Sequence, residues 1–316
     1  MKIVYLDEPT YLPESFVREI GKWGEFEAYD DRPDEETAVR RLSVADVAIV
    51  EWTRLTAGMF ERIRRLRYIG LVMTSCDLID LEAAGHAGIP VANCPSYSAR
   101  SVAEHVFALL MAANRRILQA DRTVRHGGSH VYGPFLSLGL EGRTFGVIGT
   151  GRIGQEAARI ARGFGMRVIG TNRSGREVPG IEPRSLTELM RESDVVSLHV
   201  PHDRATRGLL SAELLASMKP SAILINTSRA ALVDETALCA LLREGRIAGA
   251  GLDDVAQTRD NPLYALDNVV FTPGTAWYTR EARDANMEEL LGNIQSFVAG
   301  TPRNIVNGAF LPRRNV

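Results

Sequence analysis

The chain has little of what a disulfide scaffold, a zinc protein or a membrane protein needs. Its three cysteines, Cys76, Cys94 and Cys239, are far apart and outside any CxxC spacing, which excludes a disulfide framework and a cysteine-based zinc site. The longest uncharged apolar run, 106–113, is far shorter than the roughly 20 residues of a membrane-spanning helix. The first ten residues lack the apolar centre of a signal peptide. We therefore expect a cytoplasmic protein that binds no metal.

No charge of one sign dominates the sequence either. Thirty-seven Lys and Arg residues against 39 Asp and Glu give a formal net charge of −2, so no overall field attracts nucleic acid or an anionic membrane. With 45% hydrophobic and 24% charged residues, the 316-residue chain has the composition of a globular protein and is long enough for two cores. We expect its partners to be small molecules or proteins, and neither nucleic acid nor membrane.

Short β-branched runs alternate with helical stretches along the first hundred residues. Alternation of strand and helix is typical of a parallel sheet that is covered by helices on both faces. At Ser101 the pattern changes to a long helix, predicted over 101–117, with apolar residues around much of its circumference. We expect part of this helix to be buried against a second copy in a two-fold dimer. The strands predicted before it lie at 3–6, 47–50, 68–73 and 90–92, and helices at 13–21 and 34–42.

A second alternating series follows a glycine-rich loop at 126–142. Asp234 as N-cap, with Glu235 behind it and Gly245 beyond the end, marks one of its helices. Six strands with intervening helices predict a second doubly wound sheet, so the expected fold class is α/β with two such domains. The strands are predicted at 144–148, 166–171, 194–200, 222–227, 248–253 and 269–273, and a last helix at 280–299.

The segment GTGRIG lies where the predicted strand 144–148 ends and a helix begins. A GxGxxG sequence in this place allows a tight turn, close approach of a pyrophosphate and close packing of helix on strand. A second strand ends about 18 residues after the last glycine, as a dinucleotide-binding unit requires. We therefore expect a dinucleotide rather than an unliganded turn at these residues: Gly149, Gly151, Arg152, Ile153 and Gly154.

The preferred dinucleotide is indicated by the residues after the strand 166–171. An NAD site would place Asp or Glu there to accept hydrogen bonds from the ribose hydroxyls. This chain has Asn172, Arg173 and Ser174 instead, with a guanidinium to meet a 2′-phosphate and no carboxylate to repel it. The loop favours NADP(H), with NAD(H) second; the alternative is that Arg173 is an exposed side chain of an ordinary turn.

Seven segments together resemble the D-isomer-specific 2-hydroxyacid dehydrogenases, including glyoxylate and hydroxypyruvate reductases. The resemblance implies a flavodoxin-like substrate domain of residues 1–100 and 285–316 and a Rossmann dinucleotide-binding domain of residues 101–284. It also implies a homodimer built with the helix after Ser101 and a substrate in the cleft between the domains. The segments, in the order of the family, are NCPSYSARSVAEHVFALLMAANRRI, LEGRTFGVIGTGRIG, SLHVP, MKPSAILINTSRAALVDETALCALLREGRIAGAGLD, LDNVVFTP, AWYTREAR and GTPRNIVN.

The resemblance also implies roles for single residues. Arg229, in INTSRAAL, matches the arginine that grips the substrate carboxylate and polarises its carbonyl. It follows an apolar strand and so emerges at the carboxyl end of the sheet, where open α/β folds bind ligands; a structural ion pair is the alternative. The other expected substrate-binding residues are Arg54, Ser75, Cys76 and Trp277. Besides the glycine turn, the expected cofactor-lining residues are His199, Pro201, Thr206, Thr227, Ser228 and Asp253.

Two residues of the family pattern are missing. Members use a His in a TPH sequence, tuned by a Glu five positions after the aspartate of GLD, whereas this chain has Gly274 in FTPGTAW and Thr258 at the five-residue spacing. Asp254 and Asp260 are alternatives for the Glu, because this loop has an irregular length. The candidate substitute proton donors are His130, Tyr97, Tyr278 and Cys76.

The missing acid bears on function, because a reduced ketone must collect a proton and a positioned acid contributes about a hundredfold to ten-thousandfold. The leading hypothesis is an NADP(H)-dependent oxidoreductase with altered acid and base chemistry that acts on a small 2-oxo or 2-hydroxy acid. A second is an imine reductase for 2-imino acids, whose amine product needs no proton at that step. A third is a non-catalytic dinucleotide-binding sensor or scaffold. The substrate stays open at this point.

Overall fold

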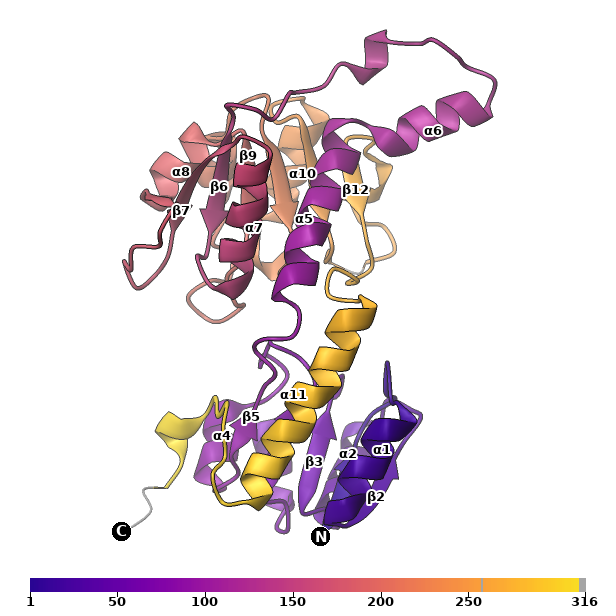
Figure 1. Cartoon of the computed structure of the whole chain (residues 1–316), viewed down its shortest axis with the longest axis vertical. Coiled ribbons are helices and arrows are strands. Elements are labelled where there is room, and N and C mark those ends of the chain that lie inside the picture. The colour runs from indigo at the N-terminus through magenta and orange to yellow at the C-terminus, as the bar shows by residue number, and fades with distance from the viewer. Residues whose placement is uncertain (257, 313–316) are drawn as a thin grey trace. The chain divides into compact units, whose positions relative to one another are not determined.

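The computed structural model describes residues 1–256 and 258–312, which form two compact units (Figure 1). Unit 1 comprises Met1–Tyr97 and the chain from Thr279 onward, and unit 2 comprises Ser98–Tyr278. Both contain a parallel sheet with helices on its two faces, so the predicted fold class of two doubly wound α/β domains is confirmed. The assignment of substrate binding to unit 1 and of dinucleotide binding to unit 2 stays a proposal.

The sheet of unit 1 has five parallel strands in the flavodoxin-like order, which agrees with the flavodoxin-like domain that the family resemblance implies. One of them, β2, was not predicted, because EFEA alternates charged and apolar residues and pairs on one side only. In order across the sheet, the strands are β2 (Glu25–Ala28), β1 (Lys2–Tyr5), β3 (Val47–Val50), β4 (Tyr68–Leu71) and β5 (Val91–Ala92).

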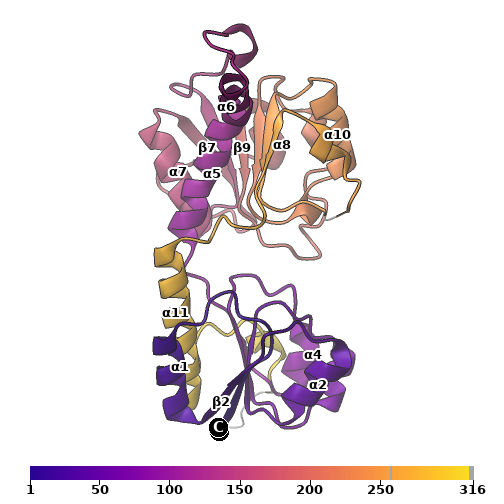
Figure 2. The same cartoon turned by 90° about the vertical axis from the view of Figure 1, so that its right-hand side faces the viewer.

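Alternate side chains of these strands enter two separate cores. Ile3 and Tyr5 join the core beneath α1 (Glu14–Ile20) and α11 (Arg280–Val298), whereas Val4 joins the core on the opposite face. Figure 2 shows the helices divided between the two faces of this sheet, α1 and α11 on one and α2 and α4 on the other. The helices of the second face are α2 (Glu35–Ser43), α3 (Ala57–Arg62) and α4 (Leu81–His86).

The sheet of unit 2 has seven parallel strands, of which six were predicted. The seventh, β8, escapes prediction because it has two residues, one of them a proline, at the edge of the sheet. The strand order reverses between β6 and β9, the kind of switch point outside which doubly wound sheets bind ligands. The strands in order are β12 (Val269–Phe271), β11 (Gly249–Leu252), β10 (Ile223–Asn226), β9 (Val195–Leu198), β6 (Thr144–Ile148), β7 (Arg167–Thr171) and β8 (Glu182–Pro183).

Helices cover both faces of this sheet. Apolar side chains of α5 (Ala99–Asn114) and α7 (Arg152–Gly163) form one core with alternate strand residues, and the opposite face packs against the remaining helices. Asp234 caps α10 as predicted, because its carboxylate accepts a 3.0 Å hydrogen bond from Ala237 N. The helices of the opposite face are α8 (Leu186–Glu192), α9 (Ala212–Ala216) and α10 (Glu235–Arg243).

The predicted helix 101–117 is wrong at its end. α5 stops at Asn114, Arg116 takes a left-handed conformation with φ 48°, and a separate helix α6 (Ile117–Arg125) follows. The apolar residues of α5 pack against α7, β10, β11 and β12 of the same unit. Several exposed apolar side chains gather instead on what we call the apolar arm, residues 117–138, which extends from the end of α5 (Figure 1). Its exposed apolar side chains are Ile117, Leu118, Val124, Val131, Tyr132 and Leu136.

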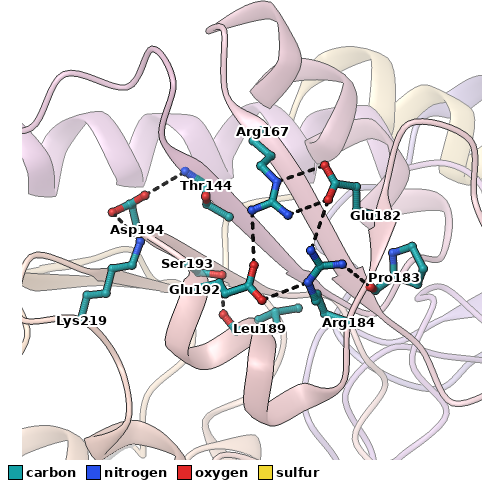
Figure 3. Close-up of polar contacts among 10 residues, drawn as sticks. All are labelled: Thr144, Arg167, Glu182, Pro183, Arg184, Leu189, Glu192, Ser193, Asp194 and Lys219. Carbon is teal, nitrogen blue, oxygen red and sulfur yellow. Dashed lines mark hydrogen bonds and ion pairs between the residues drawn. The ribbon is translucent and has the colours of Figure 1, made fainter.

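A network of ion pairs fastens the short edge strand β8. Arg167 contacts Glu182 at 2.6 Å and Glu192 at 3.3 Å, and Arg184 contacts Glu192 at 3.0 Å (Figure 3). Arg167 is the first residue of β7, and the buried Asp194, which lies nearby, directly precedes β9. Both lie at the amino ends of their strands, opposite the edge where the sheet presents its ligand-binding loops. We therefore assign this network to stability.

Candidate functional site

The GTGRIG segment forms a tight turn between β6 and α7. Gly149 has φ 98°, and a Cβ there would lie 2.5 Å from the carbonyl oxygen of His199. A Cβ on Gly154 would overlap the carbonyl oxygen of Gly149, whereas one on Gly151 would meet no atom within 4 Å. The first and last glycines are therefore required for the turn and for the packing of α7, and Gly151 leaves open space in front of the helix.

The amino end of α7 faces this open space. Gly151 is its N-cap and supplies no side-chain hydrogen bond, so the first-turn N–H groups are not capped by that residue. The side chain of Gln155 bonds backwards to the carbonyl oxygen of Thr150 at 2.9 Å and so holds the turn. A helix end of this kind favours an anion such as a pyrophosphate.

Two buried polar atoms at the same edge of the sheet have no hydrogen-bond partner among the described residues. They are Nδ1 of His199, after β9, and Oγ1 of Thr227, after β10. The other ring nitrogen of His199 lies 2.9 Å from Ser197 Oγ, and burial of the ring lowers the pKa of His199 to about 4. A neutral imidazole and a hydroxyl without partners are suited to a polar ligand, and with the glycine turn these residues fit a dinucleotide.

The loop after β7 is folded on itself by Asn172. Its Nδ2 donates to Thr150 Oγ1 and to the carbonyl oxygen of Arg176, both at 2.8 Å, while its Oδ1 accepts from Ser174 Oγ at 2.8 Å. The two small side chains of the predicted 2′-phosphate site thus make local hydrogen bonds that shape the loop. Arg173 remains exposed and lies 3.3 Å from Asp203. Sequence reasoning overlooked Arg176, a second guanidinium on this loop.

Asp203 belongs to a second loop, which follows β9. Burial opposes ionisation of its carboxyl, but hydrogen bonds from the backbone of Ala205 and Thr206 outweigh that effect and lower the pKa of Asp203. Thr206 Oγ1 donates a 2.7 Å hydrogen bond to the carbonyl oxygen of Pro201. The expected cofactor-lining residues Pro201 and Thr206 therefore lie in one internally bonded loop, and this loop contacts Arg173 through Asp203.

Arg229 lies beyond the end of β10, and its backbone is held on both sides. Its carbonyl oxygen accepts a 2.8 Å hydrogen bond from Asn226 Nδ2, and the next N–H, of Ala230, donates to Asp254 Oδ2 at 2.7 Å. Ser228 Oγ donates to the carbonyl oxygen of Leu198 at 3.1 Å. The candidate substrate arginine is thus carried by a rigid corner, and sequence reasoning did not foresee that Asn226 and Asp254 form it.

Asp253 organises the segment in which the family has its catalytic histidine. Oδ1 accepts from Thr272 Oγ1 at 2.5 Å and from Thr275 N at 2.9 Å, and Oδ2 accepts from Ala276 N at 3.0 Å. His105 Nε2, on α5, lies 2.9 Å from Thr272 Oγ1. No functional signal for His105 is visible in the sequence, because 167 residues separate it from Thr272.

Gly274 lies in the middle of this organised segment. It has φ 74°, its N–H donates to the carbonyl oxygen of Asp253 at 2.7 Å, and it is exposed. A residue with a side chain is strained in this left-handed conformation, so the backbone here is adapted to glycine. Thr258, at the position of the family's glutamate, is exposed, and so is Asp260. Neither position presents a buried carboxylate.

The candidate substrate residues of unit 1 follow two neighbouring strands. Arg54 follows β3, and Ser75 and Cys76 follow β4, which pairs with β3 in parallel register. Asp7 holds the first loop, since its Oδ2 accepts from Glu51 N at 2.7 Å and from Trp52 N at 3.1 Å.

The remaining expected site residues are placed as follows. Burial raises the pKa of Cys76 to about 11, so its thiol is protonated at neutral pH and is a poor nucleophile. Trp277, after β12 in unit 2, packs edge-on against Tyr278 with ring centroids 5.1 Å apart.

One candidate proton donor lies away from these residues. His130 is exposed on the apolar arm, which begins beyond Asn114. Asn114 is nine residues along α5 from His105, which is about 13 Å of helix axis. The arm therefore starts about 13 Å along α5 from His105, the residue of this helix that contacts Thr272. Tyr97 packs at the margin of the core of unit 1, and Tyr278 is 43% exposed.

The described part of the chain has neither a metal-binding cluster nor a helix suited to a membrane. No group of three His, Cys, Asp or Glu side chains in it is arranged to hold a metal ion. None of the helices in residues 1–256 and 258–312 is both long and apolar enough to cross a bilayer.

Enzymes of known activity resemble this chain over nearly its whole length. A glyoxylate reductase of Korarchaeum cryptofilum is 39% identical over 310 residues, which are 94% of this chain and 93% of the relative. A glycerate dehydrogenase of Methylorubrum extorquens is 35% identical over 315 residues, with 96% and 98% covered. Both are similar in length to this chain, so the likeness extends to both units.

Among solved structures, an acyclic imino acid reductase in complex with NADPH and D-Arg is 52% identical, with a TM-score of 0.96 over 97% of this chain and 100% of that one. The family model of the D-isomer specific 2-hydroxyacid dehydrogenase NAD binding domain matches residues 107–276. These likenesses confirm the resemblance seen in the sequence. The chain belongs to the D-isomer-specific 2-hydroxyacid dehydrogenases, a family of oxidoreductases that use a nicotinamide dinucleotide.

Proposed function

We propose that the protein is an NADPH-dependent reductase of 2-imino acids. The observation that carries the proposal is Gly274, which leaves no side chain where family members have their general acid, in a backbone conformation adapted to glycine. The dinucleotide turn, in contrast, keeps every glycine that its geometry requires. A protein that has the cofactor turn but lacks the general acid is suited to a substrate whose reduction does not require that acid.

A protonated imine is such a substrate. When bound, reduced nicotinamide supplies a hydride to the carbon of the C=N bond. The electron pair of that bond moves to nitrogen, which becomes a neutral amine, so no proton has to arrive at the reacting atom. Reduction of a 2-oxo acid would instead leave an alkoxide, whose protonation by a positioned acid is worth about a hundredfold or more.

Different residues of unit 2 would bind the dinucleotide and the substrate. The glycine turn and the amino end of α7 would hold the pyrophosphate, with His199, Thr227, Ser228 and Asp253 lining the path of the dinucleotide. Arg229 would bind the carboxylate of the substrate, because a guanidinium forms two parallel hydrogen bonds with a carboxylate. Arg54, Ser75, Cys76 and Trp277 are proposed as the other substrate-binding residues.

The preference for NADPH rests on the loop after β7. Arg173 is exposed at its tip, Arg176 is nearby in the chain, and the only carboxylate that Arg173 contacts among the described residues is Asp203. Two guanidiniums and no ribose-binding carboxylate at the end of β7 favour a 2′-phosphate. The NADPH found with the 52% identical imino acid reductase supports this assignment.

A second candidate function is reduction of 2-oxo acids with a substitute proton donor. It is favoured by the glyoxylate reductase that is 39% identical over 94% of the chain. It would require a side chain other than residue 274 to protonate the product. A non-catalytic sensor would bind the dinucleotide and reduce neither class of substrate.

Isotope incorporation tests the proposal. The protein is incubated with NADPH, pyruvate or glyoxylate and ¹⁵N-ammonium, which form the imine in solution, and the products are analysed by mass spectrometry. We expect ¹⁵N-alanine or ¹⁵N-glycine in equal amount to the NADP⁺ formed. Lactate or glycolate as the main product would support the second function, and absence of turnover with either substrate would support the sensor.

A further inference from the structure

A carboxylate is fixed at the backbone of the residue that follows the proposed substrate arginine. Oδ2 of Asp254 accepts a 2.7 Å hydrogen bond from the N–H of Ala230, the residue that follows Arg229. Asp254 is half-buried and lies two residues beyond the end of β11. This contact is independent of Gly274 and of the cofactor turn.

The register of the sheet explains why Asp254 meets the backbone of Ala230. β10 and β11 are parallel neighbours, with Asn226 opposite Leu252, so both chains leave the sheet at the same edge. Asp253 N donates to the carbonyl oxygen of Asn226 at 2.9 Å, which continues the pairing by one residue. Asn226 also holds the carbonyl oxygen of Arg229. The positions of Asp254 and of the corner at Arg229 are therefore set by the same two strands.

We propose that Asp254 is a specificity-determining residue that binds the cationic nitrogen of the substrate while Arg229 binds its carboxylate. This inference rests on the proposed function. A protonated 2-imino acid carries a positive nitrogen next to a negative carboxylate. The carboxylate of Asp254 and the guanidinium of Arg229 are opposite in sign to these two charges. A 2-oxo acid has only the negative charge, which Asp254 repels.

The charge of Asp254 would affect the binding of both the imine and the oxo acid. The carboxylate of Asp254 favours the protonated imine, which is the form that accepts hydride. It also disfavours the oxo acid that is present in solution together with the imine. Asp254 therefore offers a reason for substrate choice that loss of the general acid alone does not supply, since that loss slows the oxo acid without attracting the imine.

The competing explanation is that Asp254 only caps the turn after Arg229. Asp254→Asn separates the two explanations, because an amide oxygen still accepts the hydrogen bond from Ala230 N while the charge is lost. The matched control is Glu244→Gln, which removes the same charge from an exposed residue that precedes the amino end of β11. The melting temperature of each variant reports whether the turn is intact.

Binding to the NADP⁺-loaded protein is measured by calorimetry with two probes of equal carbon skeleton, D-alanine and D-lactate. We expect Asp254→Asn to weaken D-alanine at least tenfold, and to leave D-lactate unchanged or tighter, with the melting temperature retained. Glu244→Gln should change neither probe. Equal weakening of both probes, or unchanged D-alanine binding, would overturn the inference, and so would failure of the unmodified protein to bind D-alanine.

Turnover then distinguishes this inference from the function on which it rests. If the unmodified protein reduces imines and Asp254→Asn keeps the same ratio of kcat/KM for imine over oxo acid, the role of Asp254 is refuted and the proposed function stands. If the unmodified protein reduces no imine, the proposed function itself fails. We expect the ratio to fall at least tenfold in Asp254→Asn, mainly through KM for the imine.

Discussion

The N–H of Gly274 donates a 2.7 Å hydrogen bond to the carbonyl oxygen of Asp253, and the carboxylate of the same aspartate accepts from the N–H groups of Thr275 and Ala276. Three successive N–H groups are thus bound to one residue. The segment that presents the catalytic histidine in other family members is here a closed turn around Asp253. The chain lacks the histidine, and the backbone at this position has a conformation adapted to glycine.

Restoring the imidazole alone should therefore fail. Gly274→His has space, because a Cβ would meet only Asp253 O at 3.9 Å, but φ 74° imposes a cost of roughly 1 kcal/mol or more on a residue with a side chain. We expect a lower melting temperature and no gain in pyruvate reduction. Gly274→Ala is the control for backbone strain alone. A large gain from Gly274→His by itself would show that the turn readily accepts a working acid.

Pairing the imidazole with a carboxylate should have a different effect. Gly274→His combined with Thr258→Glu is expected to raise pyruvate reduction by more than the product of the two single changes, since groups that act as a unit are non-additive. The measurement is kcat/KM for the four members of the cycle. Multiplicative behaviour would mean that residues 258 and 274 do not cooperate in this chain.

Cofactor preference should depend on Arg173. Through charge-assisted hydrogen bonds worth about 1.5 to 3 kcal/mol, the guanidinium should make NADPH bind at least tenfold more tightly than NADH. Arg173→Ala should remove most of that difference and leave NADH affinity nearly unchanged. Arg176→Ala measures how much the second guanidinium contributes to the preference for NADPH. Fluorescence titration with both nucleotides decides the matter, and equal affinities in the unmodified protein would refute the assignment.

Acid should destabilise the protein through His199. Burial lowers its pKa to about 4, against 6.5 in the unfolded chain, so the unfolded state binds more protons between these values. The free energy of unfolding should therefore fall as pH drops from 6.5 towards 4, by roughly 2 to 3 kcal/mol from this residue. The free energy of unfolding is measured by chemical denaturation over this pH range, for the nucleotide-free protein and for His199→Asn. His126→Asn, a change at an exposed histidine, is the control. The expected result is a shallower pH dependence in His199→Asn only; parallel curves would contradict it.

The apolar arm should carry the dimer contact. Tyr132 is 77% exposed and Leu136 is 88% exposed, and a contact between two copies would bury such side chains. By light scattering at micromolar concentration, we expect the unmodified protein to be a dimer and Leu136→Glu to be a monomer. The control is Arg143→Glu, a change at an exposed residue beyond the arm, and the melting temperatures of the two variants are compared. A monomeric unmodified protein would refute the prediction.

The fold was predictable wherever the pattern is local. Apolar runs marked six of the seven strands of unit 2, and Asp234 marked the start of α10, because burial and capping act through neighbouring residues. β2 and β8 lack a continuous apolar run, being short edge strands. The end of α5 was missed since helical spacing continues to Ile117, and the left-handed backbone of Arg116 leaves no trace in the pattern.

The site was predictable only in part, for the same physical reason. The glycine turn depends on adjacent residues and was visible in the sequence. The contact of His105 with Thr272 and that of Asp254 with Ala230 join separate elements, so they follow from the packing of α5 and from the register of β10 and β11.

The central claim, that the protein reduces C=N rather than C=O, is tested most directly by the rate of NADPH oxidation with pyruvate as ammonium is raised from zero. The account predicts a rate near background at zero ammonium and a saturable increase as the imine forms. Rapid, saturable oxidation of NADPH by pyruvate alone, unchanged by ammonium, would contradict it.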